Sequence, residues 1–265
     1  MIPELFTLGE FIVSGYLFFY TLGLVTGSLI ILYLAKKNGL DLIETINYLI
    51  FLLITVLVGA RIYGVAYTFI KNPSQFDKQT FINSFISGGI FYGGLIVGVI
   101  FIILYSRKYF KEKRFLLYDF TAMGAAIGHS IGRLGCFSAG CCFGRPTNLP
   151  WGVKIPFLAG HPHPYRNVYI HPTQLYESVL NLLNFIFLIF LFRKRKFDGQ
   201  IGSLYLINYG IIRFFVEFFR NDSGRGYIIK NNSPFLSLSI PQLISIGLII
   251  TGITTYKLFK KRKNI

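Results

Sequence analysis

The chain has 265 residues, 53% of them hydrophobic and only 14% charged, and it carries a formal net charge of +16. On a soluble protein, so basic a charge would suggest nucleic-acid binding. Here the basic residues form short clusters beside long apolar runs, which argues against nucleic acid and indicates an integral membrane protein.

Seven apolar runs of about 20 residues follow one another along the chain. A hydrocarbon core about 30 Å thick needs about 20 helical residues to cross it, and the backbone must satisfy its hydrogen bonds internally. The sequence therefore predicts an all-α, polytopic membrane protein that forms a single integral-membrane domain over 1–265. The predicted spans are 11–35, 46–70, 86–106, 116–137, 173–192, 200–219 and 238–258.

The basic clusters lie on alternate connections between these spans. Sixteen of the 27 Lys and Arg residues follow the first, third, fifth and seventh spans. By the positive-inside rule these connections are cytoplasmic, so we expect the amino terminus outside and the carboxyl terminus in the cytoplasm. The first residues contain no basic segment and no small-residue cleavage site, so we expect the first span to be retained.

Three arginines, Arg61, Arg133 and Arg213, lie inside predicted spans. A charged side chain at the bilayer centre costs roughly 2.5–3.5 kcal/mol on insertion scales. Such residues usually face a polar cavity or an anionic ligand, so we expect the functional site beside them.

The span 116–137 carries Gly124, Gly128 and Gly132 at successive i+4 positions. Small residues at this spacing let another helix approach closely in lipid. His129 precedes Arg133 by four residues, so both project from one helix face. The pair fits an anion-binding arginine with a titratable neighbour; the alternative is an arginine that snorkels outward from the helix end.

The span 200–219 carries a polar stripe on an otherwise apolar helix. Tyr209, Arg213 and Glu217 are spaced i, i+4 and i+8, and Arg220 follows. The spacing predicts an ion pair between Arg213 and Glu217, which lowers the cost of burying either group. The pair suits a binding site or a structural brace equally well.

Two other spans begin with unusual sequences. The segment His171-Pro-Thr-Gln-Leu-Tyr-Glu177 places His171, Gln174 and Glu177 at the start of a span, as a helix cap or as one wall of a site. The segment 88–94, rich in Gly and Tyr, predicts an unwound or sharply bent entry to its span.

The long connection at about 138–172 contains six prolines, so we expect an extracytoplasmic loop or arm there and no helix. All three cysteines, Cys136, Cys141 and Cys142, lie at its start. They fit inert packing residues, a disulfide from Cys136 to either of the others, or, least well, a zinc site completed by His161 or His163.

Five motifs together resemble the bacterial prolipoprotein diacylglyceryl transferase family. They occur in the family's order and cover most of the chain. The motifs are Gly59-Ala-Arg-Ile62, Tyr92-Gly-Gly94, Gly132-Arg-Leu-Gly135, His171-Pro-Thr-Gln-Leu-Tyr-Glu177 and Tyr209-Gly-Ile-Ile-Arg-Phe-Phe-Val-Glu-Phe-Phe-Arg220.

The resemblance implies about seven helices around a central lipid-binding cavity in the bacterial cytoplasmic (inner) membrane. It also implies transfer of the diacylglyceryl group of phosphatidylglycerol to the lipobox cysteine thiol of a prolipoprotein signal peptide, with release of glycerol phosphate. No cofactor or metal is expected.

The resemblance also assigns site residues. Arg133 matches the arginine of the phospholipid-binding signature, Arg213 a second essential arginine, and Tyr209 its companion. The expected catalytic residues are His129, Tyr92, Arg213 and Tyr209. The expected substrate-binding residues are Arg133, Arg61, Gly93, Gly94, Gly144, His171, Gln174, Glu177 and Glu217.

The chain departs from the family pattern at several positions. Tyr92 stands where the family has His, Cys136 where it has Asn, and Cys141 where it has Glu, while Gly144 keeps its place. An early Tyr-Gly reads Ser14-Gly15. Because a phenol with a pKa near 10 is a poor base at neutral pH, we hypothesise that His129 takes the base role; otherwise the thiolate forms without a protein base.

Two other functions fit the same residues. One is a divergent relative that transfers a lipid group to another acceptor, with a cysteine activated by Arg133 or His129. The other is a non-enzymatic anion or lipid transporter. Transporters often show internal repeats, and the sequence contains no evident repeat.

Overall fold

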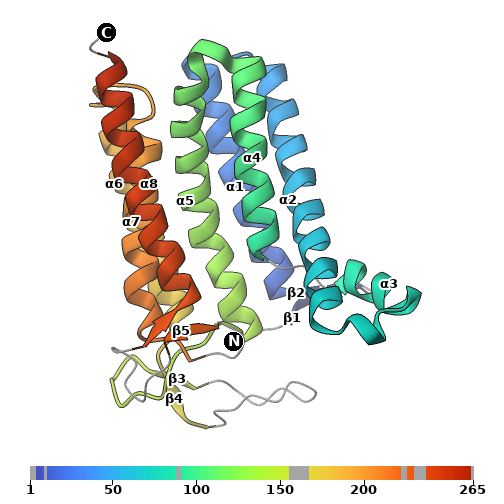
Figure 1. Ribbon diagram of the computed structural model, residues 1–265. Coiled ribbons are helices and arrows are strands. Elements are labelled where there is room, and N and C mark those ends of the chain that lie inside the picture. The colour runs from blue at the N-terminus through green and yellow to red at the C-terminus, as the bar shows by residue number, and fades with distance from the viewer. Residues whose placement is uncertain are drawn as a thin grey trace. The chain divides into compact units, whose positions relative to one another are not determined.

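The protein is mainly α-helical (Figure 1). The computed structural model describes residues 4–8, 11–87, 91–154, 167–221, 226–229 and 237–263. The helices are α1 Gly15–Lys37, α2 Leu42–Lys71, α3 Lys78–Ser87, α4 Phe91–Tyr105, α5 Arg114–Ala139, α6 Thr173–Phe192, α7 Gln200–Glu217 and α8 Ile240–Lys263. Short π and 3-10 turns are η1 Pro73–Gln75, η2 Ser106–Phe110 and η3 Lys111–Lys113.

Three antiparallel strand pairs accompany the helices. They are β1 Glu4–Leu8 with β2 Phe11–Ser14, β3 Val153–Lys154 with β4 Tyr169–Ile170, and β5 Tyr227–Ile229 with β6 Leu238–Ser239. The assignment of residues 11–14 to the first span was therefore wrong: Phe11 pairs with Leu8 and Ile12 with Thr7, and the helix begins only at Gly15. The described parts of the connection at 138–172 contain no helix beyond Ala139, as predicted.

Five helical stretches of the described chain are long and apolar enough to cross a membrane: Gly15–Lys37, Leu42–Lys71, Gly93–Ala139, Thr173–Phe192 and Ile240–Arg262. The third contains both α4 and α5, which the turns η2 and η3 separate. α7 is not among the five, because its polar stripe dilutes its apolar character. The all-α, polytopic membrane fold is confirmed; the central lipid-binding cavity stays a prediction.

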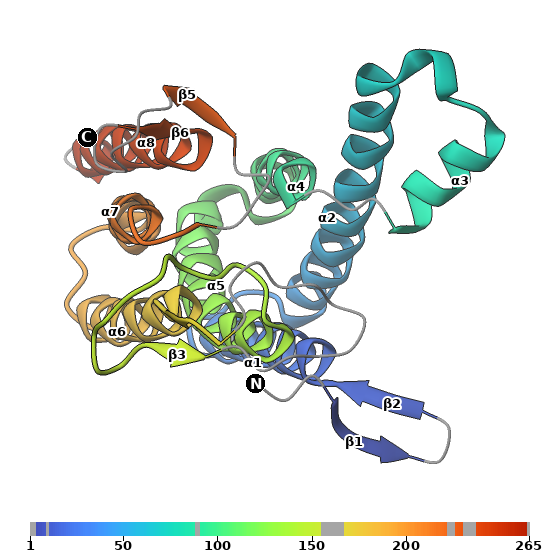
Figure 2. The same ribbon diagram turned by 90° about the horizontal axis from the view of Figure 1, so that it is seen from below.

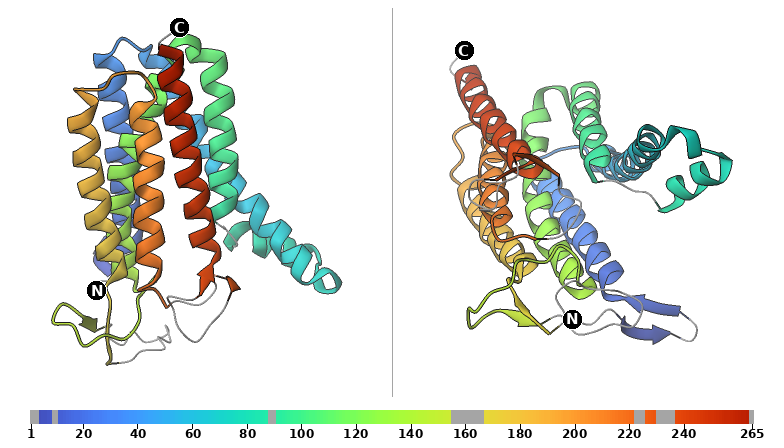
Figure 3. Two further views of the ribbon diagram at one scale, coloured as in Figure 1. Left: turned by 60° about the vertical axis from the view of Figure 1, so that its left-hand side comes forward. Right: turned by 60° about the horizontal axis from the view of Figure 1, so that its bottom comes forward.

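The chain divides into two compact units, one of residues 1–31 and 118–265 (unit 1) and one of residues 32–117 (unit 2). In unit 1, α7 lies between α6 and α8, as Figure 2 shows from below. The β1–β2 hairpin extends beyond the start of α1 (Figure 3, right).

Glycines set the contact between α1 and α5 in unit 1. A Cβ atom added to Gly23 would lie 2.6 Å from the carbonyl oxygen of Gly128, and one added to Gly27 would lie 2.6 Å from that of Gly124. The predicted close approach of a helix is thus confirmed for Gly124 and Gly128. Gly132 also lies close to α1, because a Cβ added to Gly23 would lie 3.3 Å from its backbone nitrogen, although a Cβ added to Gly132 itself would meet no described atom within 4 Å.

Polar side chains join α5, α6 and α7. Ser130 and Ser178 each donate a 2.8 Å hydrogen bond to the other's carbonyl oxygen, which ties α5 to α6. The buried carboxylate of Asp119 on α5 accepts from the backbone N–H groups of Gly199 (2.9 Å) and Gly202 (2.7 Å) and so caps the amino-terminal end of α7. These contacts fix the helices that carry the polar cluster described below.

Unit 2 is built on the pair α2 and α4, and α3 follows α2 after a short turn (Figure 3, left). Asp41 caps α2 by accepting a 2.7 Å bond from the backbone N–H of Glu44. Aromatic rings and close glycine contacts fill the helix interface: Tyr48 stacks on Phe101, and the ring of Tyr105 is tilted against both.

Candidate functional site

Glu177 on α6 lies between two arginines of unit 1. Its carboxylate, only 1% exposed, accepts a 2.8 Å hydrogen bond at Oε1 from Nη2 of Arg133 on α5. Its Oε2 atom lies 3.9 Å from Nη1 of Arg213 on α7. A buried carboxylate is strongly destabilising unless it is paired, so the two guanidinium groups account for its burial.

Arg213 also pairs with Glu217 on its own helix. Nη2 of Arg213 lies 2.9 Å from Oε2 of Glu217, which confirms the ion pair predicted from the i, i+4 spacing. Nη1 of Arg213 is buried and makes no hydrogen bond to any described residue. One edge of this guanidinium is therefore available to an anionic oxygen.

His129 lies beside Arg133, as its position one helical turn away predicted. Nε of Arg133 donates a 3.1 Å hydrogen bond to Nε2 of His129. Because an arginine N–H only donates, Nε2 is the acceptor nitrogen, and the ring is neutral with its proton on Nδ1. The imidazole is also 3.7 Å from Oε1 of Glu177 and stands 5.2 Å, centroid to centroid, from the ring of Tyr209.

The cluster faces the interior of unit 1. The side chains of Arg133 and Arg213 are 13% and 12% exposed, and both guanidinium groups contact buried Glu177. The alternative in which Arg133 snorkels outward is therefore wrong. His129, Arg133, Tyr209, Arg213, Glu177 and Glu217, all predicted from the sequence, are brought together here.

Three other predicted residues hold the connection before α6. Gln174 donates a 2.6 Å bond from Nε2 to the carbonyl of Cys141. His171 contacts the hydroxyl of Tyr176 through Nδ1 at 3.1 Å, and burial together with the charge of Arg145 lowers its pKa. Gly144 packs so tightly that an added Cβ would clash with the carbonyl oxygen of His171.

The remaining predicted residues belong to unit 2. Arg61 donates a hydrogen bond from Nη1 to the carbonyl of Ile86 in α3. Gly93 and Gly94 are helical and face α2, where an added Cβ on Gly93 would clash with Tyr63. An unwound entry is thus wrong from Phe91 onward; residues 88–90 and the side chain of Tyr92 lie outside the described part of the chain.

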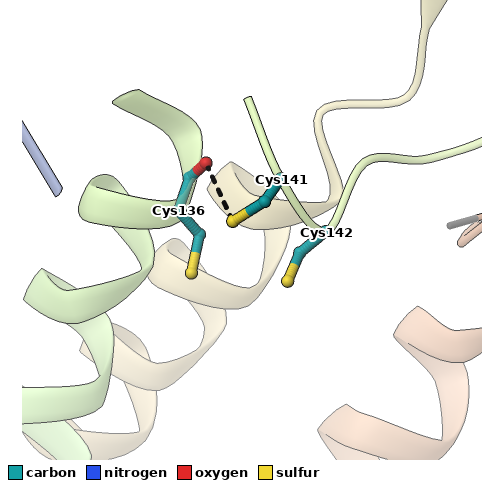
Figure 4. A group of neighbouring side chains, drawn as sticks. All are labelled: Cys136, Cys141 and Cys142. Carbon is teal, nitrogen blue, oxygen red and sulfur yellow. Dashed lines mark hydrogen bonds between the residues drawn. The ribbon is translucent and has the colours of Figure 1, made fainter. Parts of the chain in front are cut away.

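The three cysteines are free thiols whose sulfur atoms all lie within 4.8 Å of one another (Figure 4). Hydrogen bonding with Cys136 and Cys141, helped by nearby Arg220 and Arg133, lowers the pKa of Cys142. The same hydrogen bonding, with burial, raises the pKa of Cys141. The structure contains no disulfide among these residues, and His161 and His163 lie outside the described residues.

Sequence reasoning missed several buried polar groups near the cluster. Asn181 and Asn184 extend the polar face of α6 inward from Glu177, and Asn184 accepts a 2.8 Å bond from Asn208 of α7. Their spacing of four and seven residues from Glu177 was the available signal. No such signal pointed to Asp119, because its hydrogen-bond partners are backbone N–H groups that are distant in the sequence.

Long apolar helices and a buried Arg–Glu cluster define a multi-pass α-helical membrane protein with a charged interior. A model of the prolipoprotein diacylglyceryl transferase family matches residues 3–258. The chain belongs to this family and is a transferase of the bacterial inner membrane.

Three relatives illustrate the similarity, each named phosphatidylglycerol–prolipoprotein diacylglyceryl transferase. The protein of Clostridium tetani is 32% identical over 263 residues, which cover 99% of this chain and 100% of the relative. That of Finegoldia magna is 36% identical over 91% of this chain and 89% of its own. That of Campylobacter curvus is 34% identical over 98% of this chain and 94% of its own.

Proposed function

We propose that this chain transfers the diacylglyceryl group of phosphatidylglycerol to the thiol of a prolipoprotein's lipobox cysteine and releases glycerol phosphate. The names of the relatives support both substrates. The observation that carries the proposal is the pair of arginines on either side of buried Glu177, one of which has an unbonded Nη1.

The charges of the cluster suit a phosphodiester. Arg133 and Arg213 are paired with Glu177 and Glu217, and buried Arg220 adds positive charge near Glu177, which favours an arriving anion. A phosphodiester carries one negative charge and accepts paired N–H bonds from a guanidinium. Nη1 of Arg213 is the donor that can bind without breaking an existing hydrogen bond.

The transfer step is a substitution at carbon. The thiolate sulfur attacks the glyceryl carbon that carries the phosphate, a C–S bond forms, and the C–O bond breaks with its electron pair on the leaving oxygen. Negative charge grows on the phosphate in the transition state, so preplaced guanidinium groups lower the barrier. The proton of the thiol goes to a base, and no redox partner is needed.

His129 is the proposed base. Its Nε2 lone pair accepts from Nε of Arg133 in the structure, so it takes a proton only when that bond is released. A bound phosphate offers Arg133 a stronger acceptor than imidazole, because its oxygens carry a negative charge that attracts the cationic guanidinium, whereas the imidazole nitrogen is neutral. Lipid binding would thus free the base for the incoming thiol.

The other predicted residues keep their proposed roles from the family resemblance. The ring of Tyr209 lies 5.2 Å from that of His129, tilted by 53°, and would help to orient it. Gly144, His171 and Gln174 would shape the outer connection. Arg61, Tyr92, Gly93 and Gly94 belong to unit 2, and their part in substrate binding or catalysis stays a prediction from the family resemblance. We also propose that the amino terminus lies outside and the carboxyl terminus in the cytoplasm, which reporter fusions at each end would test.

The test is transfer by purified protein. The full chain in mixed micelles with phosphatidylglycerol and a lipobox peptide should yield a peptide that carries a diacylglyceryl adduct by mass spectrometry, together with free glycerol phosphate. A peptide with serine for the lipobox cysteine should yield none. Arg133→Ala should lower turnover by about 100- to 1000-fold, with Arg133→Lys in between because lysine lacks the bidentate fork.

Two results would contradict the proposal. One is a folded wild-type protein that gives no adduct while a relative gives one in parallel. The other is wild-type turnover by Arg133→Ala, which would move the phosphate site elsewhere.

A further inference from the structure

The three cysteines converge at the carboxyl-terminal end of α5, although no described step of the transfer uses them. Cys136 lies in the last turn of α5. Gly140, with φ +71°, then reverses the chain and brings Cys141 back over the helix end, where its backbone N–H bonds to the carbonyl of Cys136 at 3.2 Å. Figure 4 shows the three sulfur atoms gathered around one space, with the Cys141 thiol directed at the Cys136 carbonyl.

Cys142 adopts a backbone conformation that ordinary residues rarely take. Its φ is +60°, in the left-handed region that favours glycine. Such strain persists where surrounding contacts hold it and is concentrated at functional sites. Here it turns the Cys142 sulfur toward the other two, within 4.8 Å.

The backbone that carries two of the thiols is fixed by the start of α6. Thr173 donates a 2.8 Å bond to the carbonyl of Cys142, and Gln174 donates a 2.6 Å bond to that of Cys141. Thr173 and Gln174 are both 1% exposed. The positions of the thiols are therefore set by buried hydrogen bonds and not by a free loop.

We infer that Cys136, Cys141 and Cys142 form a three-thiolate site for a soft d10 metal ion, Zn²⁺ or Cu⁺. A metal held at about 2.3 Å from three thiolates keeps the sulfur atoms about 4 Å apart, which is compatible with three sulfur atoms that all lie within 4.8 Å of one another. A disulfide would use only two of the three and would need their sulfur atoms about 2 Å apart. Soft thiolate ligands select these ions over Mg²⁺ and Ca²⁺.

The charge around the three thiols and their accessibility also suit a metal ion. Binding releases three thiol protons to solvent and changes no oxidation state, and it leaves the site with a net negative charge. Nη1 of Arg133 lies 3.9 Å from the Cys136 sulfur and offsets that charge. Cys141 is exposed, so an ion can enter from one side.

The bound ion would cross-link the end of α5 to the turn that follows it, beside the polar cluster. It would lock the turn after α5 against the start of α6, three residues before Glu177. This inference rests on the thiol geometry and not on the proposed transfer reaction, so either can fail without the other.

The experiment counts metal and reactive thiols on the full-length protein. Reduced protein in detergent is incubated anaerobically with Zn²⁺ or with Cu⁺, desalted, and analysed for bound metal and for alkylation by N-ethylmaleimide. We expect one ion per chain, thiols protected from alkylation, and full labelling after a chelator is added. A thiolate-to-metal charge-transfer band with Co²⁺ as probe checks the site in the unmutated chain.

Variants identify the ligands. Cys136→Ser, Cys141→Ser and Cys142→Ser should each weaken metal binding by at least about 10- to 100-fold. Ala139→Ser, which adds a hydroxyl to the same turn and keeps every thiol, should bind like the wild type.

Three outcomes would overturn the inference. The first is equally fast labelling of all three thiols with and without metal. The second, in protein isolated without reductant, is a single reactive thiol that stays single after chelation and rises to three only after reduction, which marks a disulfide. The third is metal binding that survives all three serine substitutions.

Discussion

The α2–α4 interface of unit 2 and the α5–α6–α7 interface of unit 1 are built from different chemistry. In unit 2, α2 and α4 meet through glycines and aromatic rings: a Cβ on Gly94 would lie 2.7 Å from the carbonyl oxygen of Val56, and Tyr48 stacks on Phe101. In unit 1, α5, α6 and α7 meet through serines, asparagines and a charged cluster around Glu177.

The lipid environment of the helices explains this difference between the two interfaces. Apolar helices gain little from hiding apolar surface in a bilayer, so close packing of small residues is enough to join them. Buried charges inside a membrane protein are expensive and usually mark function. The contrast therefore indicates that the α2–α4 interface serves packing, while the α5–α6–α7 interface also serves chemistry.

The largest effect that the contrast predicts is on stability, at the centre of the charged cluster. Glu177→Gln removes the carboxylate between two buried guanidinium groups and should destabilise the protein by about 3–5 kcal/mol. Thermal unfolding in detergent measures it. Glu44→Gln in unit 2 weakens only a partly buried contact with Tyr105, so it should lower the free energy of unfolding by about 1 kcal/mol. Equal losses of stability in the two variants would contradict the difference between the two interfaces.

The next effect concerns catalysis in the same cluster. His129→Ala should lower turnover by about 100-fold or more with unchanged folding, because general-base catalysis typically contributes that much. Turnover of phosphatidylglycerol with a lipobox peptide is the measurement. Normal turnover would show that the thiolate forms without this imidazole.

A packing change in unit 2 should lower the stability of the protein and leave its turnover nearly unchanged. Gly98→Leu places a side chain where even a Cβ would lie 2.8 Å from Val56, so it should destabilise the protein by about 1–3 kcal/mol. Turnover per folded molecule should stay near normal. Gly247→Ala, whose Cβ meets no described atom within 4 Å, is the matched control; a selective loss of turnover in Gly98→Leu would instead give the α2–α4 interface a catalytic role.

The smallest effect on turnover is expected at the cysteines. Replacing Cys136, Cys141 and Cys142 together by serine should change transfer by less than about tenfold, since the proposed step uses the substrate's thiol and no enzyme nucleophile. The measurement is initial rate at a temperature where the variant is folded. Complete loss of transfer by a folded variant would favour a relative that uses its own cysteine chemically.

Local spacing determined much of this protein from the sequence alone. Apolar runs of membrane-spanning length located the long helices, and the i, i+4 rule paired Arg213 with Glu217 and His129 with Arg133. These features follow from the geometry of one helix, so no knowledge of the partner helices is needed. The ordered motifs added the family, which the comparisons confirmed.

Only the tertiary structure decided what lies across the helices. Glu177 joins Arg133 and Arg213 because α5, α6 and α7 pack together, and no sequence spacing encodes that contact. The first turns of α4 are helical because Gly93 and Gly94 pack on α2, although glycine alone favours unwinding. The three thiols converge because a turn with positive φ at Gly140 and Cys142 is held by α6, and such long-range hydrogen bonds have no local signature.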